Sequence, residues 1–126
     1  MTNVDITDVK IEGCEAKASC EGSSLSVQMV GNWDMSGIGP LGAFLTSLQS
    51  EVLRLHLPEV VVHFDKVEFM NSSCFKSFVK WVSSLRQLEV DKRYKIRFRT
   101  NTSLQWQRRS LEALRCFAKT HVTIDE

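Results

Sequence analysis

Apolar and polar side chains alternate along two segments near the start of the chain, residues 14–20 and 25–33. A period of two is typical of a β-strand that buries one of its faces. Between the two segments lies Glu21-Gly22-Ser23, which contains residue types that favour tight turns. The pattern therefore predicts a β-hairpin with one buried face.

From Met35 onward the apolar residues recur every three to four positions, which indicates helices. The first predicted helix has apolar residues from Leu41 to Leu55, with Pro40 in its first turn and Pro58 after its end. The apolar positions of a second helix are Phe75, Phe78, Val79, Val82 and Leu85. Those of a third are Leu104, Leu111, Leu114 and Ala118, and its N-cap is expected among Asn101, Thr102 and Ser103.

Three further segments have strand patterns. EVVVHF (59–64) is a β-branched apolar run typical of a central strand. In RYKIRFR (93–99) apolar and basic residues alternate, which predicts a strand with one covered and one open face. HVTID (121–125) is the last predicted strand. Strands separated by helices imply right-handed parallel crossovers. We therefore predict one α/β domain over residues 1–126, with a mixed sheet opened by the hairpin, helices mainly on one face, and residues 1–13 as an N-terminal extension.

The composition is that of an ordinary globular domain, with 126 residues, 43% hydrophobic and 25% charged. No apolar run approaches the roughly 20 residues of a membrane span, and the first ten residues lack the pattern of a secretory signal. Four cysteines without a CxxC motif and three scattered histidines predict neither a disulfide framework nor a metal site. We expect a soluble cytoplasmic protein without a metal, a cofactor or a membrane partner.

Charge is distributed unevenly along the chain. Residues 1–68 carry ten acidic and four basic side chains, whereas residues 69–126 carry five acidic and twelve basic ones. The basic stretch 92–115 either attracts an acidic protein surface, a nucleotide or nucleic acid, or forms a solvated face balanced by the acidic half. The three tryptophans fall on separate predicted elements, which argues against the continuous stacking groove of a single-stranded nucleic-acid binder.

The segment KVEFMNSSCFKSFVKWV (66–82) places two adjacent hydroxyls, Ser72 and Ser73, where a predicted strand ends and a helix begins. A helix N-terminus stabilises anions, and open α/β sheets place ligand sites at such edges. A helix cap by Asn71 or Ser72, a nucleophile and a phosphorylation site are the alternatives. Because Gly-x-Ser-x-Gly and the Lys-Ser/Thr ending of a phosphate-binding loop are both absent, we predict that the protein is not an enzyme.

Cys74 falls in the first turn of the same helix, where the helix dipole lowers a thiol pKa and promotes reactivity. The alternative is a buried, inert thiol that packs against the strand. We favour the buried thiol.

The segment VVVHFDKVEFMNSSCFKSFV (60–79) resembles the STAS domain family, whose best-known members are bacterial anti-sigma factor antagonists. In that family an apolar strand leads through an Asp-Ser-Ser-Gly-like turn into a helix. VGNWDMSG (30–37) is similar to the family's Gly-x-x-Asp at the end of the hairpin. The order of predicted strands and helices resembles that of the family over residues 14–126, whereas the similarity of the sequence motif itself covers only residues 60–79. Asn71 stands in place of the usual Asp and Cys74 in place of the usual Gly, so the chain resembles a divergent member.

The resemblance implies a bacterial, cytoplasmic signalling protein that regulates transcription by partner switching. It implies that an anti-sigma factor or serine kinase binds the unphosphorylated form and that phosphorylation at Ser72 prevents this binding. Ser72 is expected to face solvent, whereas Ser73 lies deeper in the helix. The implied partner-binding residues are Asp34, Ser36, Asn71, Ser72, Ser73, Cys74 and Lys76. The alternative function is the sensing of a nucleotide or small anion through Arg97, Arg99, Arg108 and Arg109.

Overall fold

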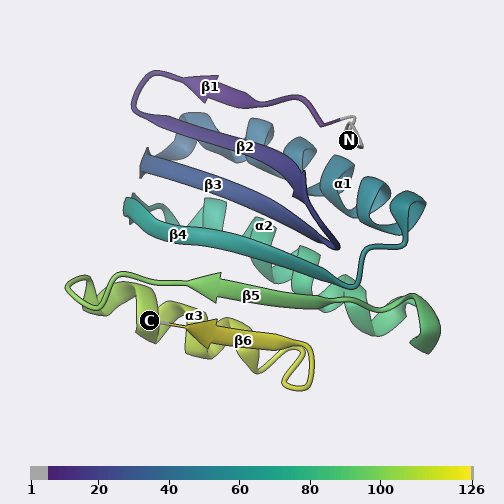
Figure 1. The fold of residues 1–126 in the computed structure, drawn as a ribbon. Coiled ribbons are helices and arrows are strands. Elements are labelled where there is room, and N and C mark those ends of the chain that lie inside the picture. Colours follow the sequence, from purple (N-terminus) through teal and green to yellow (C-terminus); the bar gives the residue numbers. More distant parts are fainter. Residues whose placement is uncertain (1–5, 126) are drawn as a thin grey trace.

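The computed structural model describes residues 6–125, and its six strands form one sheet in the order of the sequence (Figure 1). The first three strands pair antiparallel, and the third to the sixth pair parallel. The predicted mixed α/β sheet is therefore confirmed. The strands are β1 (Val9–Ile11), β2 (Cys14–Glu21), β3 (Ser24–Trp33), β4 (Glu59–Met70), β5 (Lys95–Arg99) and β6 (Val122–Asp125).

Three α-helices cover one face of the sheet and leave the other face open (Figure 1). Phe64 of β4 shows how the layers meet, because its ring contacts Phe78, Phe98 and Trp106 from three other elements with centroid distances of 5.9–6.2 Å. Among the described residues, no helix is both long and apolar enough to cross a membrane. The helices are α1 (Ile38–Leu55), α2 (Ser72–Ser84) and α3 (Gln105–Arg115), with short 3-10 turns η1 (Met35–Gly37), η2 (Leu85–Gln87) and η3 (Val90–Lys92).

The hairpin forms as predicted, but a further strand precedes it. β1 pairs with β2 so that Val9 lies opposite Ala16, and both side chains are buried. β1 is not predictable from the sequence, because its three residues are too few to establish an alternating pattern. Residues 9–11 thus form the edge of the sheet, and residues 1–5 of the expected N-terminal extension lie outside the described range.

The ends of α3 differ from the prediction. Leu104 occupies the N-cap and makes no side-chain cap bond, so the expected cap by Asn101, Thr102 or Ser103 is wrong. Asn101 instead accepts a hydrogen bond at its Oδ1 from the N–H of Ser103, at 2.9 Å. This local turn competes with capping by the same side chain. The helix ends at Arg115, so Ala118 packs into the core from the following loop rather than from the helix.

β4 is longer than its neighbour β5. β5 pairs with Glu59–His63 only, so the second half of β4 has a strand on one side alone. On the other side the fully buried Gln107 of α3 donates from Nε2 to the carbonyl oxygens of Phe64 and Val67, at 2.9 and 2.7 Å. Buried carbonyl groups require such partners. α3 therefore supports the half of β4 that leads to Ser72.

Candidate functional site

The junction between β4 and α2 is held by Asn71. Its backbone is extended, and its side-chain Oδ1 accepts a hydrogen bond from the N–H of Ser73 at 2.7 Å. The carbonyl of Asn71 accepts the first helical bond from Phe75, at 3.0 Å. This is the geometry of an N-cap, which satisfies one of the otherwise unpaired N–H groups of the first turn. Of the two predicted cap residues, Asn71 is the cap.

The two hydroxyls of the junction differ in exposure. Ser72 occupies the first position of α2 and is exposed, whereas Ser73 is half-buried. Adjacent helical residues point about 100° apart, which explains this difference. Lys76 is also exposed, and it lies one turn after Ser72 on the same side of the helix. Ser72 is therefore the accessible hydroxyl, with a cation close to it along the helix.

A second loop, at the end of β3, carries Asp34 and Ser36. The Asp34 carboxylate accepts hydrogen bonds from the Ser36 hydroxyl and from the Ser36 N–H, the latter at 2.9 Å. These bonds favour the charged form and hold the pKa of the Asp34 carboxyl below its ordinary value. Both side chains are exposed, so this loop presents a fixed negative charge at neutral pH.

The two loops lie side by side because β3 and β4 are parallel neighbours and end at the same edge of the sheet. The N–H of Asn71 donates to the carbonyl of Trp33 at 2.7 Å, and the Cys74 thiol donates to the carbonyl of Asp34 at 3.2 Å. Gly37 also packs closely on Trp33, since an added Cβ would lie 2.9 Å from the indole ring. The structure therefore brings the two predicted halves of the site together.

Cys74 requires a correction to the predicted partner-binding set. Its side chain is fully buried, so it cannot contact a partner from the surface. Burial, followed by the proximity of Cys14 and Asp34, raises the pKa of the Cys74 thiol above its ordinary value. A high pKa disfavours the reactive thiolate. Cys74 supports the surface from beneath by its bond to the Asp34 carbonyl.

Sequence reasoning missed two exposed apolar side chains near this edge. Met35 lies between Asp34 and Ser36 and is 72% exposed. Phe69 is 51% exposed and lies opposite Asn32 in the register of β3 and β4. Met35 stands at the start of a helical pattern in the sequence, and that pattern does not reveal its exposure. Phe69 falls beyond a register irregularity between β3 and β4, where alternation no longer reveals the face of a residue.

The four arginines of the alternative anion site do not form one site. Arg97 lies on the open face of the sheet between two carboxylates, 3.4 Å from Glu59 and 3.3 Å from Asp125. Arg99 alternates with the buried Phe98 and is exposed on the same open face. Arg108 and Arg109 belong to α3, which packs on the opposite face, and line a cavity of about 440 Å³ at its N-terminal end. The sheet separates the two pairs.

No protein-family model matches this sequence, and no curated protein matches it significantly. Among solved structures, the chain is similar to the crystal structure of an anti-sigma factor antagonist from Mycobacterium paratuberculosis. The TM-score is 0.59 at 17% identity, and the match covers 90% of this chain and 86% of that one. This similarity supports the STAS-like prediction at the level of the fold.

Proposed function

We propose that this chain is a non-enzymatic regulatory module that binds an anti-sigma factor or serine kinase and that phosphorylation of Ser72 prevents this binding. The exposed Ser72 hydroxyl carries the proposal, because it lies at the start of α2 beside the Asp34 loop on a fold shared with an anti-sigma factor antagonist. The proposed binding surface, called the junction surface below, comprises Asp34, Met35, Ser36, Asn71, Ser72, Ser73 and Lys76.

A phosphate on Ser72 is compatible with the folded protein. It adds about −1.5 to −2 charges. The N-terminus of α2 and the Lys76 ammonium one turn away both favour negative charge at this position. The modification therefore acts on partner binding rather than on folding.

The same phosphate opposes association. A partner that covers the junction surface removes water from the phosphate and holds it near the ionised Asp34 carboxylate, so desolvation and repulsion add. Met35 gives the surface an apolar group that adapts to a partner's shape. We therefore expect Met35 to contribute to partner binding and a negative charge at Ser72 to weaken it.

Charge-mimicking variants test the switch. Wild-type protein, Ser72→Ala and Ser72→Asp are used to capture partners from a lysate of the native organism, and captured proteins are identified by mass spectrometry. We expect an anti-sigma factor or kinase with the wild type and Ser72→Ala, and about tenfold less with Ser72→Asp, a loss of about 1.4 kcal/mol. Equal capture by both variants would contradict the switch, and capture of neither class of partner would contradict the function.

The site of modification is tested with ATP and the same lysate. We expect phosphate on Ser72 in the wild type, its loss in Ser72→Ala and its retention in Ser73→Ala, because Ser73 is half-buried. Circular dichroism of each variant controls for folding. Phosphate mainly on Ser73, or none on a folded wild-type protein, would contradict the assignment.

A second candidate function, sensing of a nucleotide or small anion, is favoured by the cavity beside Arg108 and Arg109. A ligand that binds the native state raises the melting temperature by mass action. Thermal unfolding is measured with GTP, ATP and cyclic dinucleotides at millimolar concentration, with Arg109→Ala as the control. An upward shift that Arg109→Ala abolishes would support this candidate, and no shift would rule it out.

A further inference from the structure

A groove of about 380 Å³ lies along β1, and Figure 1 shows this strand at one edge of the sheet with α1 behind it. Residues 7–11 form one wall of the groove. The other wall is a face of α1 whose side chains recur at helical spacing, namely Pro40, Ala43, Phe44 and Ser47. None of these four side chains is charged, and no residue of the groove belongs to the junction surface.

The backbone of β1 has one free side. Ile11 and Cys14 flank a two-residue turn and lie opposite each other in the register of β1 and β2, so their backbone groups bond to each other. Because the bonding direction alternates along a strand, the N–H and C=O groups of Lys10 point away from β2, as do those of Asp8 two residues earlier. A free edge of this kind can accept a further strand.

Charges of opposite sign follow one another along this edge. Asp8 and Lys10 are exposed on either side of the buried Val9, and neither forms an ion pair within residues 6–125. When two β1 strands pair antiparallel with Val9 at the twofold axis, Asp8 of each copy lies opposite Lys10 of the other. Lys10 then lies between two carboxylates, because Glu15 of β2 is its neighbour within the same chain. Opposite charges at facing positions stabilise a sheet.

The same charges disfavour the alternative registers. Centring the pair on Asp8 or on Lys10 places like charges directly opposite each other, which destabilises a sheet. Centring it on Lys10 also places Asp8 opposite Glu12 of the second copy. In the register centred on Val9, the Val9 and Ile11 side chains of the second copy lie on the side of the uncharged α1 wall. The free edge of β1 is therefore complementary to a second copy of itself.

A simpler explanation is that β1 is a protected edge, because short length and charged side chains discourage strand pairing. Protection requires charges that repel a second copy, whereas Asp8 and Lys10 attract one in a single register. The other edge strand, β6, fits the explanation better. Its one charged residue, Asp125, lies 3.3 Å from Arg97 within the same chain and offers no free partner.

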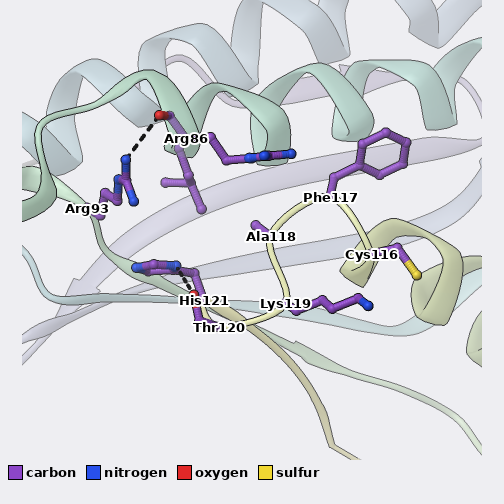
Figure 2. Close-up of a pocket in the computed structure, with 9 residues that line it drawn as sticks. Arg86, Arg93, Cys116, Phe117, Ala118, Lys119, Thr120 and His121 are labelled. Atoms are coloured by element: carbon purple, nitrogen blue, oxygen red, sulfur yellow. Dashed lines mark hydrogen bonds between the residues drawn. The ribbon is translucent and has the colours of Figure 1, made fainter.

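The surroundings of β6 also oppose self-association at that edge. Arg86, Arg93 and Lys119 line a cavity of about 260 Å³ next to the start of β6, and no acidic residue lines it. Figure 2 shows the charged ends of these three residues pointing in different directions, so they do not form one binding site. A twofold contact through β6 would bring the cations of two copies together, and like charges repel. β1 is therefore the edge that suits a second copy.

We propose that two copies of this chain associate through β1, with Val9 at the twofold axis, so that their sheets join into one continuous sheet. The contact is isologous, because both copies contribute the same residues. The paired segments are short, so the buried area falls at the low end for specific interfaces, and the dimer forms at micromolar concentration. Since the groove shares no residue with the junction surface, dimerisation does not depend on the proposed switch at Ser72.

Sedimentation velocity of the full-length protein over a range of micromolar concentrations tests this interface. We expect a monomer–dimer equilibrium for the wild type and the same equilibrium for Ser72→Asp. Asp8→Lys and Lys10→Asp should each weaken the dimer about tenfold, equivalent to about 1.4 kcal/mol, because two attractive pairs become repulsive. An equimolar mixture of these two variants should regain wild-type affinity, because one variant is positive at both positions and the other is negative at both.

The matched controls are Asp91→Lys and Lys92→Asp, which make the same charge changes at exposed residues of η3, outside the groove. Both should keep the wild-type dimer. Amide shifts that depend on protein concentration should lie at residues 7–11 and 40–47. A wild type that stays monomeric at millimolar concentration would overturn the inference, as would a dimer that Asp8→Lys and Lys10→Asp leave intact. Equal weakening by the controls, or a mixture that fails to associate, would overturn it as well.

Discussion

At the scale of single residues, the Asn71 side chain caps α2 with an oxygen atom but carries no charge, and substitutions can test these two properties separately. Its Oδ1 accepts from the N–H of Ser73 at 2.7 Å, and alanine at this position removes that acceptor. We expect Asn71→Ala to lower the free energy of unfolding by about 0.5–2 kcal/mol, measured by urea denaturation.

The matched variant is Asn71→Asp, which keeps the capping oxygen and adds a negative charge at the helix N-terminus. Aspartate caps as well as asparagine and also interacts favourably with the helix dipole. We therefore expect its unfolding free energy to equal or exceed that of the wild type. If both variants lose the same stability, the side-chain cap is not what stabilises this junction.

At the scale of elements, α3 is attached to β4 through Gln107. This residue shares the helix face of Leu111 and Leu114, so the apolar pattern alone favours leucine at position 107. The structure instead predicts that leucine at position 107 destabilises the protein. Gln107→Leu leaves the carbonyls of Phe64 and Val67 without their side-chain donor, at about 1–3 kcal/mol for each buried unsatisfied group.

Urea denaturation measures this effect, and Gln105→Leu serves as the control because Gln105 is exposed on the same helix. We expect the control to change stability by less than about 0.5 kcal/mol. Backbone amide shifts of residues 64–71 should change in Gln107→Leu and not in the control. An unchanged or higher stability of Gln107→Leu would show that water or another group satisfies these carbonyls.

At the scale of the whole molecule, a buried polar network joins two helices to the strand layer. Trp81 of α2 donates from Nε1 to the Tyr94 hydroxyl at 2.7 Å, and this hydroxyl donates to Oε1 of Gln49 in α1 at 2.8 Å. Burial raises the pKa of the Tyr94 phenol far above its ordinary value, despite the opposing hydrogen bond from Trp81. The folded protein therefore retains the phenol proton at a pH where the unfolded chain has lost it.

This linkage predicts loss of stability at alkaline pH. The contribution of Tyr94 is fully present below the unfolded pKa of about 10 and falls as pH rises above it, by up to about 1.4 kcal/mol per pH unit. Tyr94→Phe should be less stable at pH 8, because Trp81 Nε1 loses its acceptor, but should show a shallower alkaline decline. Tyr94 is the only tyrosine in the chain, so ultraviolet titration of the phenol reports this group alone. Titration near pH 10 in the folded protein would contradict the linkage.

The sequence by itself determined the features that depend on neighbours within a turn or a hairpin. Alternation on both sides of Gly22 predicted the paired strands β2 and β3, and the change of period predicted α1 and α2. The polar residues before α2 offered a cap as one alternative, which the structure confirms for Asn71, and the family resemblance implied that Ser72 is more exposed than Ser73. These inferences hold because strand alternation, helix periodicity and capping are set by adjacent residues.

Only the tertiary structure decided what depends on distant segments. Gln107 appears in the sequence as a polar interruption of an apolar face, and its role follows from β5 being shorter than β4. Arg97 and Arg108 are close in the basic stretch, but the sheet separates them. Arg86 and Lys119 are 33 positions apart, yet they line one cavity. Whether a carbonyl group or a charge finds a partner depends on which distant segments fold against one another. The local sequence pattern does not contain this information.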